Sequence, residues 1–447
     1  MFQKQIINLF QWIAIALGAL LCVFLAINAF DETLDPEAKA VLNAAHTVIK
    51  ADNAYFYWVG IYTSPTNNPV ESGSKCIAAQ RKASQFSISD QTTIPECNES
   101  NEIKYLNEKL ASCDLRTQSC LAQYTHLHAT VNQLAKQNQV LLTRYDYLLK
   151  FTQYDDTYSI APIFIFKVLP STLYQAISAV RLQDGDPSGF IQNIKTENKF
   201  YRVVLSGNTS LIAKMIGRAE LERSARLISE AVRMHPSIAL QYQTDLLEIA
   251  HPMNSAELNL KKTMESEFRL VVQELKLSDF DKVSMLHRLL FHNELKPNAT
   301  VNQLYHNMMA LASLSEIPTN QYLAAEKTTM QQLGFPPPES YFNLIYNPVG
   351  KILASFTVEP YNDYIRDIID ADGLLRLTTL QIQIAAQKIP EAAIPNFLNQ
   401  AGSKLSDPYT GHPMLWDRTR GLYFRGYGNH ITDKNGFVSV KLHDDVD

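Results

Sequence analysis

Residues 6–30, IINLFQWIAIALGALLCVFLAINAF, carry no charged side chain and are rich in Ile, Leu, Ala and Phe. This stretch is longer than the roughly 20 residues that a helix needs to cross a bilayer. Lys4 precedes it, while Asp31 and Glu32 follow at once. Because basic residues favour the cytoplasmic side, the pattern predicts a single-pass anchor with its N-terminus in the cytoplasm and the bulk of the chain across the membrane.

A cleaved signal peptide and a buried core helix are the two alternatives to an anchor. The apolar run exceeds the roughly 7–15 residues of a signal-peptide core, and Ile27 stands where cleavage favours a small residue. Leu21, just before Cys22, is too large for a lipoprotein processing site. The sequence therefore favours an uncleaved anchor over residues 1–30.

Composition excludes one class of partner. The chain has 447 residues, which leaves room for two or three domains. It carries 40 basic and 45 acidic residues, for a net charge of −5, without a long run of either sign. A nucleic-acid-binding protein is expected to show a basic stripe, so we expect no nucleic-acid partner.

The cysteines also indicate that the chain beyond the apolar stretch is exported. Apart from Cys22, the chain has only Cys76, Cys97, Cys113 and Cys120. An even, clustered set in an exported segment predicts two disulfides. Among the possible pairings we favour the sequential one, Cys76–Cys97 with Cys113–Cys120, because it closes the shortest loops. A zinc site with His126 and His128 is the alternative, but the spacing fits no short zinc motif, so we expect neither metal nor cofactor.

Beyond the anchor the patterns are mainly helical. A helix is expected to begin near Pro36, whereas residues 62–102 are rich in turn formers and predict a loop. Apolar spacing predicts one long amphipathic helix over 119–151 and a second one that ends at Met234-His235-Pro236. The charged residues of the second helix are expected to form a solvated face. They are Arg218, Glu220, Glu222, Arg223, Arg226 and Glu230.

The last quarter changes character after GFPPPES. There, YNPVGKILASF opens a helix, and a long apolar-periodic run covers 360–389. GLYFRGYG and FVSVKL predict strands joined by a turn at DKNG. The expected fold is mainly α: an anchor at 1–30, a disulfide-bearing helical and loop segment at 31–125, an irregular helical periplasmic domain at 126–335, and a C-terminal helix with a small α+β tail of two or three antiparallel strands at 336–447.

The turn cassette DPYTGHPMLWD lies between the C-terminal helical residues and the aromatic, strand-like ones. Asp407-Pro408 is expected to stop the preceding helix, and Gly411 with Pro413 to set a turn. Trp416 should begin an aromatic strand that packs on a helix. We interpret the cassette as a connector, although His412 between two aspartates could belong to an active site.

Two resemblances rest on quoted stretches. DNAYFYWVGI after the anchor, with YNPVGKIL and YIRDIIDADGLLRL, resembles an uncharacterised group of proteobacterial inner-membrane proteins, which implies an inner-membrane location and no assigned activity. The tail around Asp407-Pro408 and Gly411 is similar to the C-terminal portion of proteins related to type II secretion pseudopilins. It departs from them in lacking their N-terminal processing site and in offering only Asp433 as a calcium ligand. We take this second likeness as one of local fold.

Motifs for catalysis or metal binding have simpler explanations. RLQDGDPSGFIQNIK begins like a calcium loop at Asp184, but Lys195 stands where a Glu is required, so a turn is expected. His287 and His292 lie five apart and do not share a helix face. The paired carboxylates Asp155-Asp156 and Asp363/Asp367 are expected at helix caps and solvated faces. Four nearby tyrosines are expected to pack in the core rather than to stack on a sugar; they are Tyr145, Tyr147, Tyr154 and Tyr158.

These observations favour a noncatalytic, membrane-anchored periplasmic protein that binds or scaffolds another protein of the bacterial envelope. One alternative is a periplasmic hydrolase of cell-wall glycan or peptide, whose titratable groups would have to converge in a cleft. Another is a membrane-anchored helical folding factor similar in layout to the lipase chaperones. Their Arg-x-x-Phe-Asp-Tyr motif is matched here only at Phe280-Asp281.

Overall fold

The computed structural model describes residues 2–44, 52–83, 119–157, 169–276, 295–334, 345–356 and 358–443. The chain is mainly helical and has one small antiparallel sheet near the C-terminus, which confirms the coarse fold expected from the sequence. Its packing defines two units. Unit 1 comprises Met1–Ala45, Phe268–Leu311 and Ala324–Asn362, and unit 2 comprises His46–Glu267, Ala312–Leu323 and Asp363–Asp447.

The elements follow in chain order. The first helices are α1 (Phe2–Ile27), α2 (Pro36–Leu42), α3 (Ala54–Val59), α4 (Pro69–Ala83), α5 (Cys120–His126), α6 (His128–Gln137) and α7 (Gln139–Leu148). The middle helices are α8 (Leu169–Gln183), α9 (Pro187–Ser206), α10 (Leu211–Met234), α11 (Ser237–Gln241), α12 (Gln243–Ala250), α13 (Ser255–Leu258) and α14 (Lys261–Lys276). The later elements are α16 (Pro297–Leu314), η4 (Thr319–Gln321), α17 (Tyr322–Gln332), α18 (Pro348–Ser355), α19 (Val358–Gln387), η6 (Glu391–Ala393), α20 (Ile394–Gln400), η7 (Ser403–Leu405), β1 (Leu415–Asp417), β2 (Gly421–Arg425) and β3 (Phe437–Val440).

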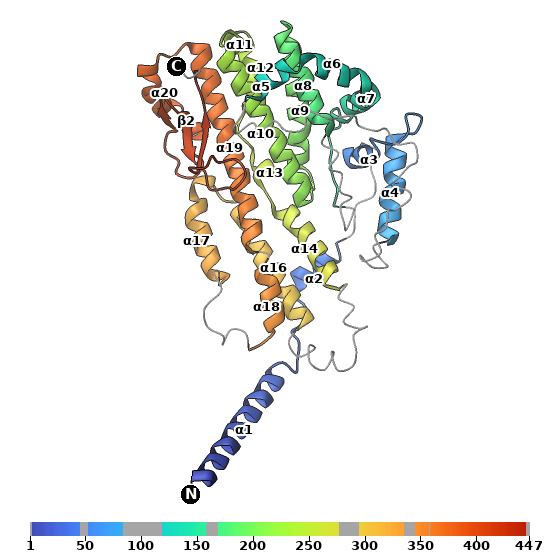
Figure 1. Cartoon of the computed structure of the whole chain (residues 1–447), viewed down its shortest axis with the longest axis vertical. Helices are drawn as coiled ribbons and strands as arrows, with labels where there is room; N and C mark the ends of the chain where they lie inside the picture. The colour runs from blue at the N-terminus through green and yellow to red at the C-terminus, as the bar shows by residue number, and fades with distance from the viewer. Residues whose placement is uncertain are drawn as a thin grey trace. The chain divides into compact units, whose positions relative to one another are not determined.

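The first helix, α1, is long and apolar enough to cross a membrane, and its window Phe10–Ile27 is not buried against the rest of the chain (Figure 1). Large side chains such as Trp12 and Leu20 are 70% and 66% exposed. A core helix of a soluble protein would bury such side chains. The expectation of a helix over the N-terminal apolar stretch is therefore confirmed.

Unit 1 outside α1 is built from short helices with polar caps. Asp35 caps α2, because its Oδ1 accepts hydrogen bonds from the backbone N–H groups of Glu37 (2.7 Å) and Ala38 (3.3 Å). Phe268 and Tyr305 pack edge to face with ring centroids 5.3 Å apart, and both are buried. The helix predicted near Pro36 and the helix opened by YNPVGKILASF are both present, as α2 and α18.

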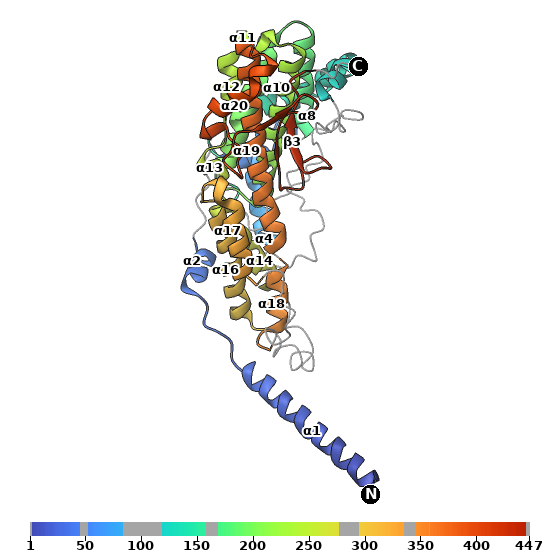
Figure 2. The same cartoon turned by 90° about the vertical axis from the view of Figure 1, so that its left-hand side faces the viewer.

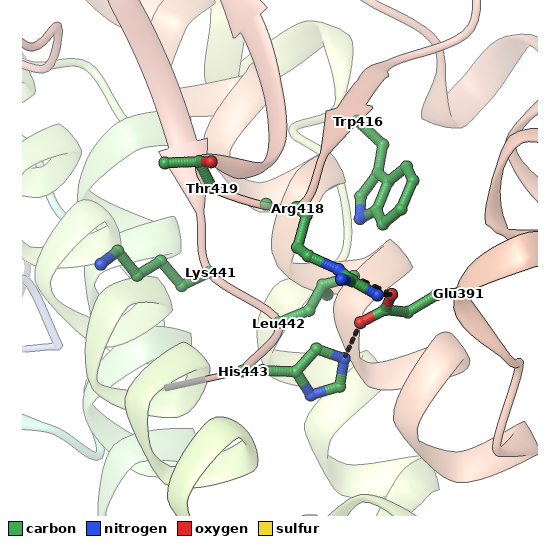
Figure 3. Close-up of a pocket in the computed structure, with 8 residues that line it drawn as sticks. Glu391, Trp416, Arg418, Thr419, Lys441, Leu442 and His443 are labelled. Carbon is green, nitrogen blue, oxygen red and sulfur yellow. Dashed lines mark hydrogen bonds and ion pairs between the residues drawn. The ribbon is translucent and has the colours of Figure 1, made fainter. Parts of the chain in front are cut away.

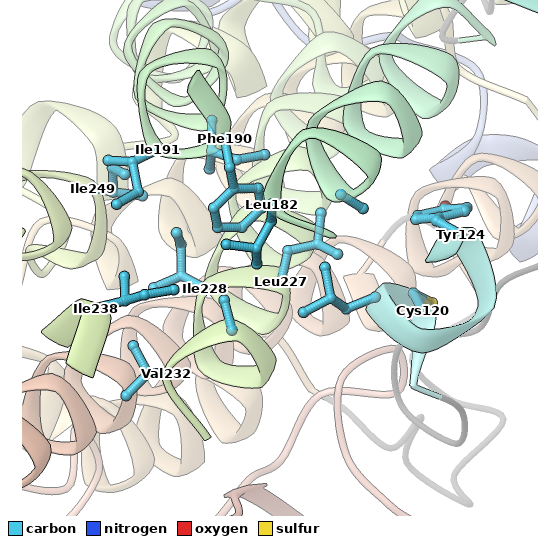
Figure 4. Close-up of a cluster of buried hydrophobic side chains, with 14 of the residues drawn as sticks. Cys120, Tyr124, Leu182, Phe190, Ile191, Leu227, Ile228, Val232, Ile238 and Ile249 are labelled. Atoms are coloured by element: carbon cyan, nitrogen blue, oxygen red, sulfur yellow. The ribbon is translucent and has the colours of Figure 1, made fainter. Parts of the chain in front are cut away.

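A hydrophobic core of unit 2 lies among α8, α9, α10 and α12 (Figure 4). Phe190, Leu227 and Ile228 are buried there, and the short helix α11 adds Ile238. Each such side chain contributes about 1.5–3 kcal/mol relative to exposure. The second predicted amphipathic helix is confirmed as α10, since Ser210 caps its start by accepting from the N–H of Ala213 and it ends at Met234.

The sheet of unit 2 has the strand order β1-β2-β3, and both pairings are antiparallel. Trp416 lies opposite Leu422, and Phe424 lies opposite Val438. The sheet lies beside α19 in both views (Figures 1 and 2), and the Phe424 ring fills the space over Gly373 of that helix. The two predicted strands and the turn between them are therefore confirmed, and the strand expected at Trp416 is present as β1, which begins one residue earlier.

Two segments differ from the sequence-based expectation. Residues 119–151 form three helices, with breaks at Leu127 and Asn138. The side-chain amide and the backbone N–H of Asn138 both donate to the Leu134 carbonyl at 2.9 Å. Part of the predicted loop 62–102 is the helix α4. Its glycine is needed for close packing, since a Cβ at Gly73 would lie 1.9 Å from the carbonyl oxygen of Phe56.

Candidate functional site

One face of α19 carries three carboxylates, Asp363, Asp367 and Asp370, at helical spacings of four and three. The C-terminal tail folds onto this face. The Asp370 Oδ2 atom accepts hydrogen bonds from the N–H of Gly428 (2.7 Å) and of Tyr427 (3.2 Å). A Cβ at Gly428 would lie 2.3 Å from Asp367 Oδ1, so only glycine permits this approach. The expectation of a solvated face is wrong for Asp367, which is fully buried.

Asp367 also holds an imidazole ring. Its Oδ2 lies 2.5 Å from His430 Nδ1, and its Oδ1 accepts the backbone N–H of His430 at 3.2 Å. The aspartate is fully buried, whereas the His430 side chain is 58% exposed. A buried carboxylate that fixes the tautomer and orientation of an imidazole is also the arrangement that supports a general base in hydrolases.

The turn cassette connects this region to the sheet. Asp407 Oδ1 accepts the N–H of Tyr409 (2.8 Å), and Gly411, at φ 69°, donates to the Asp407 carbonyl (2.9 Å). Tyr409 is 3% exposed and its hydroxyl donates to Asp370 Oδ1 (2.7 Å). The cassette is thus a connector, as predicted, with Tyr409 as its anchor on α19. Asp407-Pro408 does not stop the preceding helix, since α20 ends earlier, at Gln400.

Buried titratable groups around the tail have shifted pKa values. Burial raises the pKa of Asp370 to about 6, although hydrogen bonds from Tyr409 and Gly428 oppose the shift. Away from α19, burial likewise raises the pKa of Asp156 to about 7. Asp156 is 1% exposed, and its carboxylate accepts hydrogen bonds from the backbone N–H and from the hydroxyl of Ser210, each at 2.6 Å. The expectation of a solvated Asp155-Asp156 pair is therefore wrong for Asp156.

A pocket opens beside the sheet, at the end of β1 (Figure 3). Its lining residues are Glu391, Trp416, Arg418, Thr419, Gly421, Lys441, Leu442 and His443. Glu391 Oε2 lies 2.6 Å from Arg418 Nη2, and Glu391 Oε1 lies 3.9 Å from His443 Nε2. The Arg418 guanidinium lowers the pKa of Glu391, and the carboxylate raises the pKa of Arg418.

The pocket places an exposed cation next to an apolar ring. The Arg418 side chain is 82% exposed, so its ion pair with Glu391 is a surface pair and contributes little stability. A carboxylate from outside could therefore replace Glu391 on Arg418 at small cost. The indole of Trp416 borders the same hollow and offers an apolar surface (Figure 3). Trp and Arg are the residues that most often dominate binding energy at protein interfaces.

A second polar cluster lies deep in unit 2, between α8, α9 and α10. Gln175 Nε2 donates to both Glu197 Oε2 (2.8 Å) and Glu220 Oε2 (3.0 Å). The Tyr145 hydroxyl donates to Glu197 Oε1 at 2.6 Å. Burial, together with the charge of Glu220, raises the pKa of Glu197 to about 8. The predicted solvated face of α10 is therefore wrong at Glu220, which is 2% exposed and pairs with Arg223 at 2.9 Å.

The predicted disulfides are tested in part. Cys76 and Cys120 are buried, and both are disulfide-bonded. No disulfide joins two described residues, and Cys97 and Cys113 lie outside them. Cys22, on α1, is the free cysteine of the described chain. The pairing itself therefore stays a prediction.

The remaining sequence candidates are mostly structural. The supposed calcium loop is a turn between α8 and α9, as expected: Gly185 has φ 83°, and Asp186 caps α9 by accepting from the N–H of Gly189 (2.8 Å). Tyr145 and Tyr154 are buried as expected, but Tyr147 is 55% exposed.

Other candidates lie outside the described residues: Tyr158, His287, His292, Phe280 and Asp281. Within the described ranges, no group of three or more His, Cys, Asp or Glu residues could hold a metal ion.

Sequence reasoning missed Arg418, His443 and Tyr409. Arg418 follows β1 and His443 follows β3, the two outer strands of the sheet, and the two side chains are brought to one pocket through Glu391, which no spacing rule predicts. Tyr409 lies inside the cassette that the sequence singled out, and its burial in a polar turn could have been suspected from its aromatic ring.

The fold and the candidate sites define a mainly helical protein with one apolar N-terminal helix. Near its C-terminus, a small sheet lies beside α19 and a pocket lies beside that sheet. Comparison with known protein families, with curated proteins and with solved structures gave no match. The resemblances to proteobacterial inner-membrane proteins and to pseudopilin tails therefore remain expectations drawn from the sequence.

Proposed function

We propose that the protein is a noncatalytic binding or scaffold protein, anchored in the bacterial inner membrane by α1, with both units in the periplasm. The exposed apolar window of α1 supports the anchor. The bonded state of Cys76 and Cys120 supports an oxidising compartment for unit 2. Lys4 before the apolar stretch and Asp31 after it support a cytoplasmic N-terminus.

The observation that carries the binding role is the pocket of Trp416 and Arg418. The partner is a protein that presents a carboxylate next to an apolar side chain. Its carboxylate takes the place of Glu391 on Arg418, and its apolar group covers the Trp416 indole. Such an exchange replaces a weak surface pair with a better shielded one, so the free energy of binding is concentrated in two side chains.

The topology is tested with a reporter fused after Asp447. A reporter that is active only in the periplasm should give signal, and a reporter that is active only in the cytoplasm should give none. The reverse result would overturn the orientation and the oxidising compartment together.

Binding is tested by quantitative affinity capture of the full chain from envelope extracts. We expect Trp416→Ala and Arg418→Ala each to weaken capture of the partner by about tenfold or more, because truncating such anchors costs about 2 kcal/mol. Leu415→Ala is the matched control: Leu415 is 51% exposed on the same strand, but successive strand residues point to opposite faces of a sheet. Equal capture by all variants, or no reproducible partner, would contradict the proposed role.

The Asp367–His430 pair favours a second candidate, a periplasmic hydrolase of cell-wall glycan or peptide. In that case His430 would act as general base and Asp367 would orient it. Purified full chain would release soluble fragments from cell-wall material, and His430→Ala would abolish the release. Release that persists in His430→Ala, or no release by the wild type, would count against the hydrolase.

A further inference from the structure

One buried asparagine joins the end of α1 to two other segments of unit 1. The backbone N–H of Asn347 donates to Asn28 Oδ1 (3.0 Å). Its side-chain Oδ1 accepts the N–H of Lys296 (2.8 Å), and its Nδ2 donates to Thr300 Oγ1 (3.1 Å). Asn347 is 2% exposed and has φ 49°, a left-handed conformation that asparagine tolerates better than most residues. It therefore fixes three chain segments at one point.

Further hydrogen bonds make this connection stiff. Asn28 is fully buried, and its Nδ2 donates to the Ile345 carbonyl at 2.7 Å. Asp31 accepts the N–H groups of Asn298 (2.8 Å) and Ala299 (3.1 Å) at the start of α16. We call the segments 28–33, 296–302 and 345–350 the anchor junction. Because its polar groups are satisfied internally, the junction holds unit 1 directly against the end of α1.

Apolar side chains are exposed at this junction. Phe30 is 81% exposed, Ile345 is 37% exposed, and Ile352 on the adjoining turn of α18 is 44% exposed. The opposite side of α18 is packed: Gly350 is buried, and a Cβ there would lie 2.0 Å from Thr300 Oγ1. Ile352, two residues after Gly350, is therefore on the opposite side of α18, which unit 1 does not cover.

Their distance from the membrane end of α1 is short. The apolar window ends at Ile27, next to Asn28. Ile352 follows Asn347 by five residues, which is about 8 Å along a helix. The interfacial region of a bilayer is about 5–8 Å deep on each side, and helices that lie in it bury apolar side chains to about 5–10 Å. Phe30 follows Asn28 by two residues and the Ile345 carbonyl accepts the Asn28 side chain, so all three side chains lie within about one interfacial depth of chain from the end of α1.

We propose that Phe30, Ile345 and Ile352 form a face that rests in the interface of the bilayer that holds α1. This inference rests on the proposed anchor and adds that unit 1 lies on the lipid surface instead of standing clear of it. A lipid surface is the partner that fits, because the junction fixes these side chains at the level where α1 leaves the hydrocarbon. The face is apolar, so neutral lipids should suffice.

The test uses the full chain with Cys22→Ser, so that a single added cysteine can carry a fluorescent label sensitive to its environment. Ile345→Cys and Ile352→Cys are labelled in phosphatidylcholine vesicles that contain some lipid with a nitroxide on the headgroup. We expect emission to shift to shorter wavelength and to be quenched by the nitroxide. Leu240→Cys is the matched control, since Leu240 is 58% exposed on α11 and lies in unit 2; its label should keep water-like emission.

Flotation of the vesicles tests the membrane anchor separately from the membrane contact of unit 1. Protein that floats, but whose labels at 345 and 352 keep water-like emission, would overturn the membrane contact and leave the anchor standing. Protein that does not float would overturn the anchor and the contact together.

A second variant tests the junction. Asn28→Ala removes both hydrogen bonds to the segment that precedes α18 while leaving the apolar window intact. We expect flotation to be unchanged and quenching at position 345 to be lost. Asn132→Ala, an exposed asparagine on α6, should leave both unchanged. Quenching that survives Asn28→Ala would show that the junction does not hold the face on the membrane.

Discussion

Glu197 is fully buried at the centre of unit 2, where its carboxyl group binds Tyr145 and Gln175. Its sequence context gives no warning, because α9 also carries charged residues that are exposed. The same holds for Glu220, whose spacing on α10 fits a solvated face. The 3.6-residue period locates a helix and its apolar side, but it does not show whether a charged residue at the edge of that side is covered by a third helix.

Glu197 makes the stability of unit 2 depend on pH. Its pKa is raised from the ordinary 4.5 to about 8 in the folded chain, so the folded state holds a proton that the unfolded state releases. The free energy of unfolding should therefore fall as the pH rises from about 5 to about 8. Glu197→Gln, which mimics the protonated carboxyl, should flatten this decline in denaturant titrations at several pH values. An unchanged slope would show that other groups cause it.

Gly373 tests the contact between α19 and the sheet. Alanine at this position would gain about 1 kcal/mol of helix propensity, but its Cβ would lie 2.2 Å from the buried ring of Phe424. Overpacking of this kind costs about 1–3 kcal/mol, so we expect a net loss of stability in Gly373→Ala. The smaller side chain of Phe424→Leu should reduce the loss in the double variant. Additive losses in the double-mutant cycle would rule out the contact as the cause.

At the scale of elements, strongly periodic segments were predictable and their interruptions were not. The helix α10 and the strands β2 and β3 follow from spacing and turn residues. The break at Asn138 coincides with a side-chain hydrogen bond to the Leu134 carbonyl, which spacing does not reveal. Likewise, the Gly and Pro residues around α4 suggested a loop, yet Pro69 begins the helix and Gly73 permits its close approach to Phe56.

The cysteines tie α4 and α5 to the rest of the chain. Cys76 lies on α4 and Cys120 begins α5, and both are bonded. Reduction should lower the free energy of unfolding by about 2–5 kcal/mol, measured by denaturant titration with and without reductant. Peptide mapping of the unreduced chain should recover Cys76 linked to Cys97, and Cys113 linked to Cys120. Recovery of crossed pairs would exclude the sequential pairing.

At the scale of the molecule, the order of the segments along the chain does not predict which of them pack together. Unit 1 and unit 2 each collect segments that are far apart in the chain. For example, Asp372 Oδ1 accepts the N–H of Met253 (2.7 Å), and Arg226 donates to the Ile431 carbonyl (3.3 Å). The C-terminal cassette could be recognised as a connector, but its partner, the carboxylate face of α19, could not. That pairing depends on the three-dimensional path of the tail.

Removal of the tail should therefore damage unit 2 as a whole. A chain that stops after Leu405 lacks the sheet and leaves Asp370 without its hydrogen bonds from Tyr409 and Gly428. The apolar face that the tail leaves uncovered costs several kcal/mol, which is comparable to the stability of a domain. We expect the truncated chain to be degraded quickly in limited proteolysis at sites within 46–267. Resistance equal to that of the full chain would show that the tail is an independent addition.

The hydrogen bonds between Asp370 and the tail also set an order of events during biosynthesis. Residues 407–430 leave the ribosome after α19 and the other helices of the same unit, which they complete. Domains usually fold from the N-terminus as they are made, but this unit cannot complete its packing until residues 407–430 have been made. During that interval its apolar helix faces need protection, so production of the protein should depend strongly on chaperones that shield unfinished chains.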